Sequence, residues 1–295
     1  MTVEQLKPVF LDTFRRFGED RATSIAASLA FYAMLSISPV LVLAVLITGM
    51  VLGEESARTA LLEQVQDMIG RQGAEFIESL LVNQTLNQNG FWPALLSIGV
   101  ILFGASALFV QLRDAVHVIW GEAPSRSGVL AMVVQRLVAG VMVVVFGLVV
   151  LAWLGLETFL AYWKPGGVGS SIWPVVTVLI SVCFFTFVAA AWMKYLVPER
   201  LSWGDVWPGG LVVAVLFTLG KVILALYFAL AKVSAAYGSA GAIVILLLWI
   251  YYNAQIFFLG LEFVQSLALD RRRLHPERKR KIDEKSERRR EEQAA

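Results

Sequence analysis

The chain of 295 residues is 58% hydrophobic and only 16% charged, with a mean hydropathy of +0.69. A soluble domain of this size carries about 25% charged residues, so the composition excludes an ordinary soluble fold and indicates a chain that lies mostly in lipid. The net charge of +2 gives no support for nucleic acid as a partner, and the lone Cys183 excludes an intramolecular disulfide.

Six stretches are long and apolar enough to cross a bilayer core, which requires roughly 20 helical residues. They are residues 24–52, 92–112, 129–157, 173–196, 209–231 and 240–269. The expected fold is therefore all-α: a polytopic membrane protein whose single transmembrane domain of six helices occupies residues 24–269.

Three segments flank or interrupt these spans. Residues 1–23 form an amphipathic arm, with phenylalanines on one helical face and arginines on the other. Residues 53–91 are polar, but their apolar side chains recur at helical spacing, which predicts amphipathic helices that either lie on the membrane surface or cap the bundle. Residues 270–295 hold 11 basic and seven acidic residues with almost nothing apolar, which is typical of a disordered tail.

The distribution of Lys and Arg predicts the orientation, because positive residues mark the cytoplasmic side. The N-terminal arm, the C-terminal tail and the loops after the second and fourth spans carry most of the 25 basic residues. Both termini are therefore expected in the cytoplasm, with residues 53–91 on the periplasmic side.

Lys221 is the basic residue that falls near the middle of a span, where a charge is costly and often functional. Further polar groups are expected at a similar depth, together with a proline that interrupts helical bonding. These are Ser36, Ser38 and Pro39 in the first span, and Tyr252, Asn253 and Gln255 in the sixth. Two interpretations stay open: the groups line a polar cavity or substrate path, or they hold helices together by interhelical hydrogen bonds.

Arg136 and Glu262 lie closer to the cytoplasmic side. Each is seven residues from a helix end, about 10 Å at the rise of an α-helix. Because their depths match, we predict an ion pair between the third and sixth spans that acts as a gate. The alternative is that each side chain reaches the interface by itself.

Small residues predict where helices pack closely. Ala26 and Ala30 provide them in the first span, and Gly238, Gly241 and Ala242 at the start of the sixth.

The sequence shows no motif typical of an enzyme or of a metal site. There is no phosphate-binding loop, and the two histidines, His117 and His275, have no Cys, His or carboxylate neighbours at metal-ligand spacing. We expect no enzyme, no metal and no cofactor.

Several runs resemble the YihY/BrkB family of bacterial inner-membrane proteins. They are YGSAGA at 237–242, LLWIYY at 247–252, GLE at 260–262 and PERLSWGDVWPGG at 198–210. The resemblance implies a bundle of six helices in the bacterial inner membrane, with cytoplasmic termini. Some members carry an old ribonuclease label, which nothing in this sequence supports, and the family has been suspected of moving lipids or other envelope precursors.

The function expected from these features is that of a transporter-like protein. It would move a lipid or another anionic, amphipathic envelope substrate, with membrane lipids as its partners and no nucleic acid. The alternative is a scaffold for envelope assembly that recruits partners through residues 53–91 or the tail; a ribonuclease is disfavoured. The sequence leaves a homo-oligomer open.

Overall fold

A computed structural model of the chain describes residues 3–82, 91–121, 128–162, 169–197, 201–231 and 241–274. These residues form helices, with the following bounds: α1 Val3–Glu19, α2 Ala22–Leu52, α3 Glu54–Val82, α4 Phe91–Ile119, α5 Gly128–Tyr162, α6 Gly169–Leu196, α7 Trp203–Ala231 and α9 Gly241–Leu274. Gly238 and the tail from residue 275 lie outside the described residues.

Five of the described helices contain a stretch long and apolar enough to cross a membrane: Ala22–Met50, Val138–Leu160, Trp173–Leu196, Trp203–Leu224 and Gly241–Asp270. The remaining predicted span, 92–112, falls within α4, a helix of 29 residues. The all-helical, polytopic class is confirmed, whereas the number of six spans and the side of the membrane on which each end lies stay predictions.

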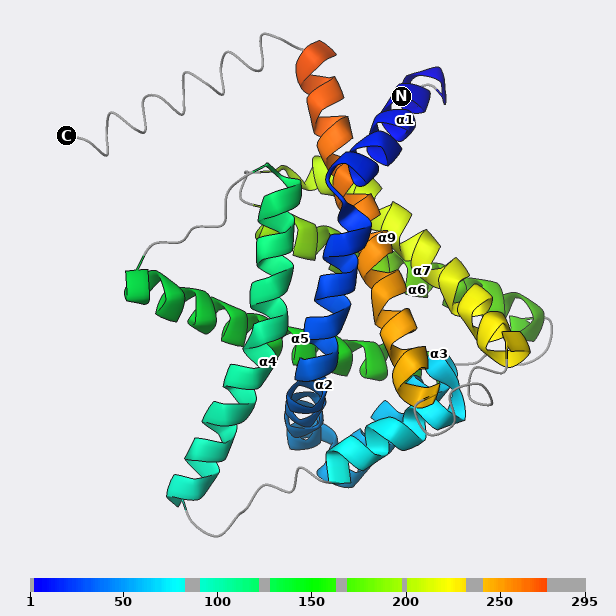
Figure 1. Cartoon of the computed structure of the whole chain (residues 1–295). Coiled ribbons are helices and arrows are strands. Elements are labelled where there is room, and N and C mark those ends of the chain that lie inside the picture. The colour runs from blue at the N-terminus through cyan, green and yellow to red at the C-terminus, as the bar shows by residue number, and fades with distance from the viewer. Residues whose placement is uncertain are drawn as a thin grey trace.

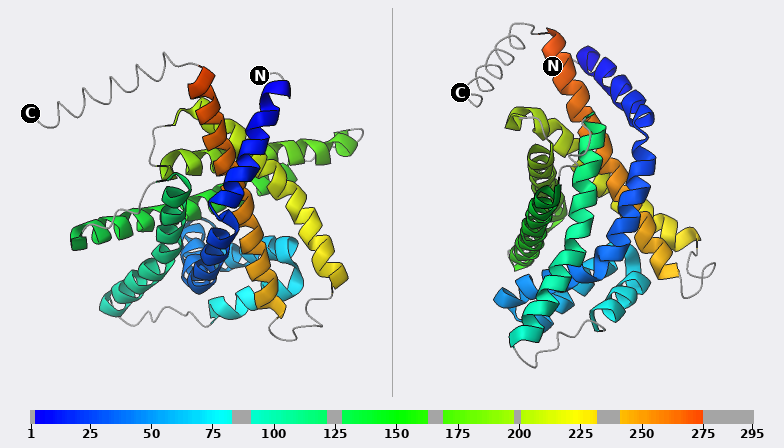
Figure 2. Two further views of the ribbon diagram at one scale, coloured as in Figure 1. Left: turned by 45° about the horizontal axis from the view of Figure 1, so that its top comes forward. Right: turned by 60° about the vertical axis from the view of Figure 1, so that its left-hand side comes forward.

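Helix α9 is the central element, because α1, α2, α3 and α7 all pack against it. In Figure 1 it lies between α2 and α7, and α5 crosses α2 and α4 at a steep angle. Helix α6 packs along α7, and α4 packs along α2. Figure 2 shows from two further directions that α1 and the last turns of α9 lie together at one end of the molecule.

Helix α3 closes the opposite end as a hairpin. Gly70 has φ 80°, a conformation that suits glycine, and interrupts the helix there. The two arms meet through an ion pair of 3.2 Å between Arg58 and Glu78. Leu62, Val65 and Phe76 pack against a buried cluster that includes Ile245 and Trp249 of α9. Of the two arrangements expected for 53–91, these contacts are those of a cap on the bundle.

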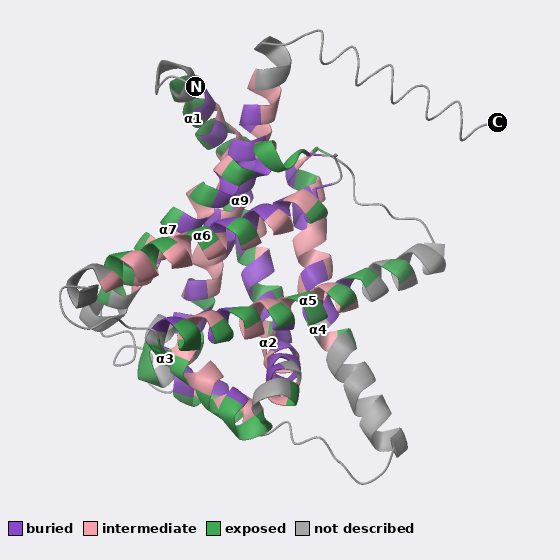
Figure 3. Cartoon of the chain, turned by 180° about the vertical axis from the view of Figure 1, so that it is seen from behind, coloured by how far each residue is buried: buried purple, intermediate pink, exposed green. Residues whose placement is uncertain are grey.

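The largest buried cluster lies at the α1 end, and α2, α4, α6, α7 and α9 contribute to it. Glycines allow the close approach of α6, α7 and α9 there. A Cβ atom on Gly210 would lie 2.5 Å from the Thr186 carbonyl oxygen of α6, and one on Gly209 would lie 2.8 Å from the Gly260 carbonyl oxygen of α9. Figure 3 shows the buried residues gathered on α9 and its neighbours, with exposed residues along α5, α6 and α7.

Candidate functional site

Lys221 lies on α7 at the edge of its contact with α9. Its side chain is half-buried, and among the described residues it makes no hydrogen bond or ion pair. The next two residues, Val222 and Ile223, are 69% and 62% exposed. Lys221 therefore lies beside an exposed, apolar part of the α7 surface.

Tyr252 of α9 makes a contact between helices, whereas Asn253 bonds within its own helix. The Tyr252 hydroxyl donates a hydrogen bond of 2.8 Å to the Leu216 carbonyl of α7. Its ring occupies the space that a side chain at Gly220 would need, since a Cβ atom there would come within 2.2 Å of the ring. Asn253 donates to the Trp249 carbonyl of its own helix at 2.7 Å. The Tyr252 bond links α7 and α9, the Asn253 bond does not link two helices, and the choice between a polar cavity and helix packing stays a prediction.

The remaining residues of the predicted path lie on α2 and on α9 itself. Ser36 and the Ser38 hydroxyl of α2 are buried, and the latter has no hydrogen-bond partner among the described residues. Pro39 packs toward α4, where its Cγ lies 3.0 Å from the position of a Cβ on Gly104. Gln255 is half-buried. Because α9 packs against both α2 and α7, a common cavity for these groups and Lys221 stays a prediction.

The small residues lie in close helix contacts where they are described. Ala26 and Ala30 are 0% and 1% exposed on α2. Gly241 is buried and Ala242 half-buried in the first turn of α9.

Glu262 is the most enclosed ionisable group that the structure describes. It is 0% exposed, and neither carboxylate oxygen has a hydrogen-bond partner among the described residues. The side chain of its predicted partner, Arg136 on α5, lies outside the described residues, so the ion pair stays a prediction.

The charged groups that act on Glu262 come from α1 and from the break between α1 and α2. Asp20 acts on it most strongly, ahead of Arg16 and Asp12. Arg16 is itself bound to Asp12 at 2.8 Å. Arg21, beside Asp20, has φ 51°, a left-handed conformation that is costly for a residue with a Cβ and that often occurs at functional sites.

Two polar residues of the next turn of α9 extend this site. The Gln265 amide donates a hydrogen bond of 3.4 Å to the Ile119 carbonyl at the end of α4, while its oxygen has no partner among the described residues. The hydroxyl of Ser266 is also buried without a partner in that set. Buried polar groups are almost always hydrogen-bonded, so three such groups within two turns are unusual.

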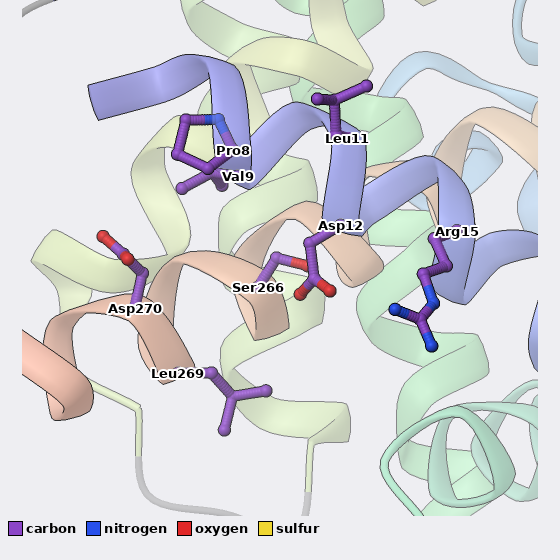
Figure 4. Close-up of a pocket in the computed structure, with 8 residues that line it drawn as sticks. All are labelled: Pro8, Val9, Leu11, Asp12, Arg15, Ser266, Leu269 and Asp270. Carbon is purple, nitrogen blue, oxygen red and sulfur yellow. The ribbon is translucent and has the colours of Figure 1, made fainter. Parts of the chain in front are cut away.

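A pocket of about 340 Å³ lies between α1 and the end of α9. Its lining residues are Pro8, Val9, Leu11, Asp12, Arg15, Ser266, Leu269 and Asp270. In Figure 4, Asp12 and Ser266 point toward one another from the two helices. Arg15 donates to Glu19 at 2.8 Å, and this bond raises the pKa of the guanidinium, which therefore stays charged.

Sequence reasoning found Glu262 but missed the residues that surround it. Ser266 and Asp270 follow Glu262 at intervals of four residues, which places them on the same helical face. That spacing is a signal in the sequence. The contribution of Asp12 and Asp20 could not be read from it, because it depends on how α1 folds back onto α9.

The described residues contain no group of three or more His, Cys, Asp or Glu side chains that could hold a metal ion. The arrangement at Glu262 therefore differs from a multi-carboxylate metal centre. It is a buried carboxyl beside a second carboxylate, with an open pocket one turn away.

Curated proteins similar to this chain are bacterial membrane proteins. One from Azotobacter vinelandii is 25% identical over 88% of this chain and 63% of its own length; one from Ralstonia nicotianae is 27% identical over 91% and 60%. Both are named UPF0761 membrane protein, and the chain spans less than two thirds of either. A third, from Bacillus subtilis, is 26% identical over 90% of this chain and 97% of its own length, and is named as a ribonuclease-like protein, YfkH.

No solved structure matches the chain. The model of the family described as Virulence factor BrkB matches residues 13–286, which include all the predicted spans. The relatives from Azotobacter vinelandii and Ralstonia nicotianae are named as membrane proteins, in agreement with the apolar helices of the fold. The chain is thus a multi-pass membrane protein, and it belongs to the Virulence factor BrkB family.

Proposed function

We propose that this protein is a transporter-like protein of the bacterial inner membrane that moves an anionic, amphipathic envelope substrate such as a lipid along the outer side of α7. The observation that carries the proposal is Lys221, a positive charge within an apolar helix that has no partner among the described residues. A charge within a membrane requires a counter-charge or water.

The surroundings of Lys221 fit a lipid-like substrate. Leu219, Val222 and Ile223 are each more than half exposed on α7, so acyl chains can lie against the helix while a phosphate approaches the amino group. The Tyr252 bond to Leu216 holds this part of α7 against α9. In this proposal Lys221 provides the charge, and Gln255 and the serines of α2 provide polar groups farther inside.

The test is lipid movement in liposomes that contain the purified, full-length protein. A fluorescent phosphatidylglycerol is followed by dithionite bleaching, which reports lipid that reaches the outer leaflet. Lys221→Met is expected to reduce the rate of movement at least tenfold, whereas Lys221→Arg retains most of it because it keeps the charge.

The matched control is Leu179→Met, an exposed position on α6, which is expected to move lipid like the wild type. A labelled lipid with no net charge is expected to move slowly in every variant. Equal rates for wild type and Lys221→Met, with both correctly inserted, would overturn the role of Lys221.

A scaffold role is the second candidate, and one observation favours it. The α3 hairpin uses its apolar side to cap the bundle and leaves charged side chains exposed, among them Glu54, Glu55, Arg71 and Glu75. Reversing the charges of Glu54 and Glu55 distinguishes the two functions. If the protein is a scaffold, the charge reversal abolishes the binding of partner proteins and the function in cells. If it is a transporter, lipid movement by the purified protein and the function in cells are unchanged.

A further inference from the structure

A buried carboxyl at the α1 end of α9 has no hydrogen-bond partner or ion pair among the described residues. Glu262 is 0% exposed, and its oxygens accept no hydrogen bond from any described residue. Among the described charges that act on it, Asp20 and Asp12 are negative, and the positive group, Arg16, is bound to Asp12. An ionised carboxylate in such a place is strongly disfavoured unless a cation is close.

The other helices around Glu262 contribute apolar side chains. Ala22 of α2, Val116 of α4, Met193 of α6 and Val206 of α7, each 0% exposed, belong to the buried cluster that includes Leu261, the neighbour of Glu262 in the chain. Farther along α4, Asp114 and His117 have interactions of their own. Among the described residues, the charged groups that act on Glu262 are therefore those of α1 and of the break after it.

Three residues with side-chain oxygens follow one face of α9 from Glu262 to the pocket. Glu262, Ser266 and Asp270 follow one another at intervals of four residues on α9, a distance of about 6 Å per step. Ser266 lines the pocket with a buried hydroxyl that has no partner among the described residues. Asp12 points toward it from α1, and Asp270 lies farther out. Carboxylate and hydroxyl oxygens are the ligands of hard cations.

We propose that Glu262 is the inner ligand of a binding site for a monovalent cation, either H⁺ or Na⁺, that enters through the pocket between α1 and α9. Either cation supplies the charge that the described residues do not provide: H⁺ bonds to a carboxylate oxygen, and Na⁺ is coordinated by it. Asp20 adds a second carboxylate, and Ser266 a hydroxyl on the way in. The site does not depend on whether the protein moves lipid.

The test is thermal unfolding of the purified, full-length protein at constant ionic strength, with NaCl replaced stepwise by choline chloride at several pH values. A cation that binds the folded state raises the midpoint of unfolding, by about 5 °C at a concentration a hundredfold above its dissociation constant. A Na⁺ site gives a rise with NaCl at neutral pH. A proton site gives a rise as the pH is lowered in choline chloride, because the folded state then takes up more protons than the unfolded state.

Glu262→Gln is expected to remove whichever response the wild type shows, since an amide needs no counter-charge. Glu75→Gln, a change at an exposed acid on α3 that is paired with Arg71, is the control and is expected to keep the response. Asp20→Asn provides a second variant outside α9. It is expected to weaken Na⁺ binding about tenfold, measured with ²²Na⁺, or to diminish the response to pH.

Two results would overturn the proposal. One is a wild-type midpoint that responds to Na⁺ and to pH no differently from that of Glu262→Gln, or of Asp20→Asn where the former does not fold. The other is an Arg136→Gln variant that is unstable in every buffer and is restored by Glu262→Gln, because the counter-charge would then come from the chain itself.

Discussion

The polar side chains near the two ends of α9 differ in whether they have hydrogen-bond partners. At the α3 end, Gln64 donates to Glu157 and accepts a hydrogen bond of 3.4 Å from Trp153, while Arg58 pairs with Glu78. At the α1 end, Glu262 and the Ser266 hydroxyl are buried with no hydrogen-bond partner among the described residues. The same helix therefore passes from a region where charged and amide groups are satisfied to one where they are not.

This difference separates structural from functional polarity. A pair such as Gln64 and Glu157 links α3 to α5 by a hydrogen bond. An unsatisfied buried carboxyl raises the free energy of the folded state unless something else binds to it. We infer that the α3 end holds the bundle together, whereas the α1 end binds a cation.

The largest predicted effect concerns the close helix packing that keeps the α1 end dry. Gly210→Ala places a methyl group against the backbone of α6, because its Cβ would lie 2.5 Å from the Thr186 carbonyl oxygen. We expect a loss of about 3 kcal/mol in the free energy of unfolding, measured by chemical denaturation in detergent. Gly140→Ala is the control, since a Cβ there meets nothing within 4 Å. Equal stability of the two variants would contradict the packing of α6 on α7.

The next effect tests whether the α3 end is structural. Gln64→Ala removes the donor to Glu157 and the acceptor for Trp153, and we expect a loss of about 2 kcal/mol in the free energy of unfolding. Gln66→Ala, at an exposed position of the same helix, serves as the control. If lipid movement falls in Gln64→Ala while stability does not, the division between the two ends is wrong.

Tyr252→Phe is expected to have a smaller effect. It removes the hydrogen bond to the Leu216 carbonyl but keeps the ring against Gly220. A loss of about 0.6 kcal/mol follows, which is typical of such bonds between membrane helices. Tyr251→Phe is the control, because no hydrogen bond of its hydroxyl occurs among the described residues. A change in cation response without a change in stability would place Tyr252 in the binding machinery instead.

The smallest effect is expected at the exposed ion pair of the α3 hairpin. Arg58 and Glu78 lie 3.2 Å apart, with side chains 29% and 51% exposed. A double-mutant cycle with alanine at both positions should give a coupling of about 0.5 kcal/mol that weakens as salt is added. A coupling several times larger would mean that the pair, rather than the apolar face of α3, determines how the hairpin closes.

Much of the fold follows from apolar length, and the candidate site only in part. Hydropathy predicted three of the five stretches that can cross a membrane to within two residues, and those of α5 and α7 to within nine. It did not predict that α4 continues to Ile119, because hydropathy gives the length of the apolar stretch, and a helix can continue beyond that stretch. Equal depth suggested Arg136 as the partner of Glu262. Depth, however, gives the level of a residue and not the direction in which its helix face points. The break between α1 and α2 at Asp20 and Arg21, which brings Asp20 toward Glu262, cannot be predicted from the pattern of apolar residues.

The most direct test of the cation site compares the unfolding of Glu262→Gln and Glu157→Gln with that of the wild type at neutral pH in a buffer free of Na⁺. We predict that Glu262→Gln is at least as stable as the wild type, because the amide needs no counter-charge, and that Glu157→Gln is less stable. A loss of about 3–5 kcal/mol in Glu262→Gln, as expected when one partner of a buried ion pair is removed, would contradict the cation site and show that Glu262 has its partner within the chain.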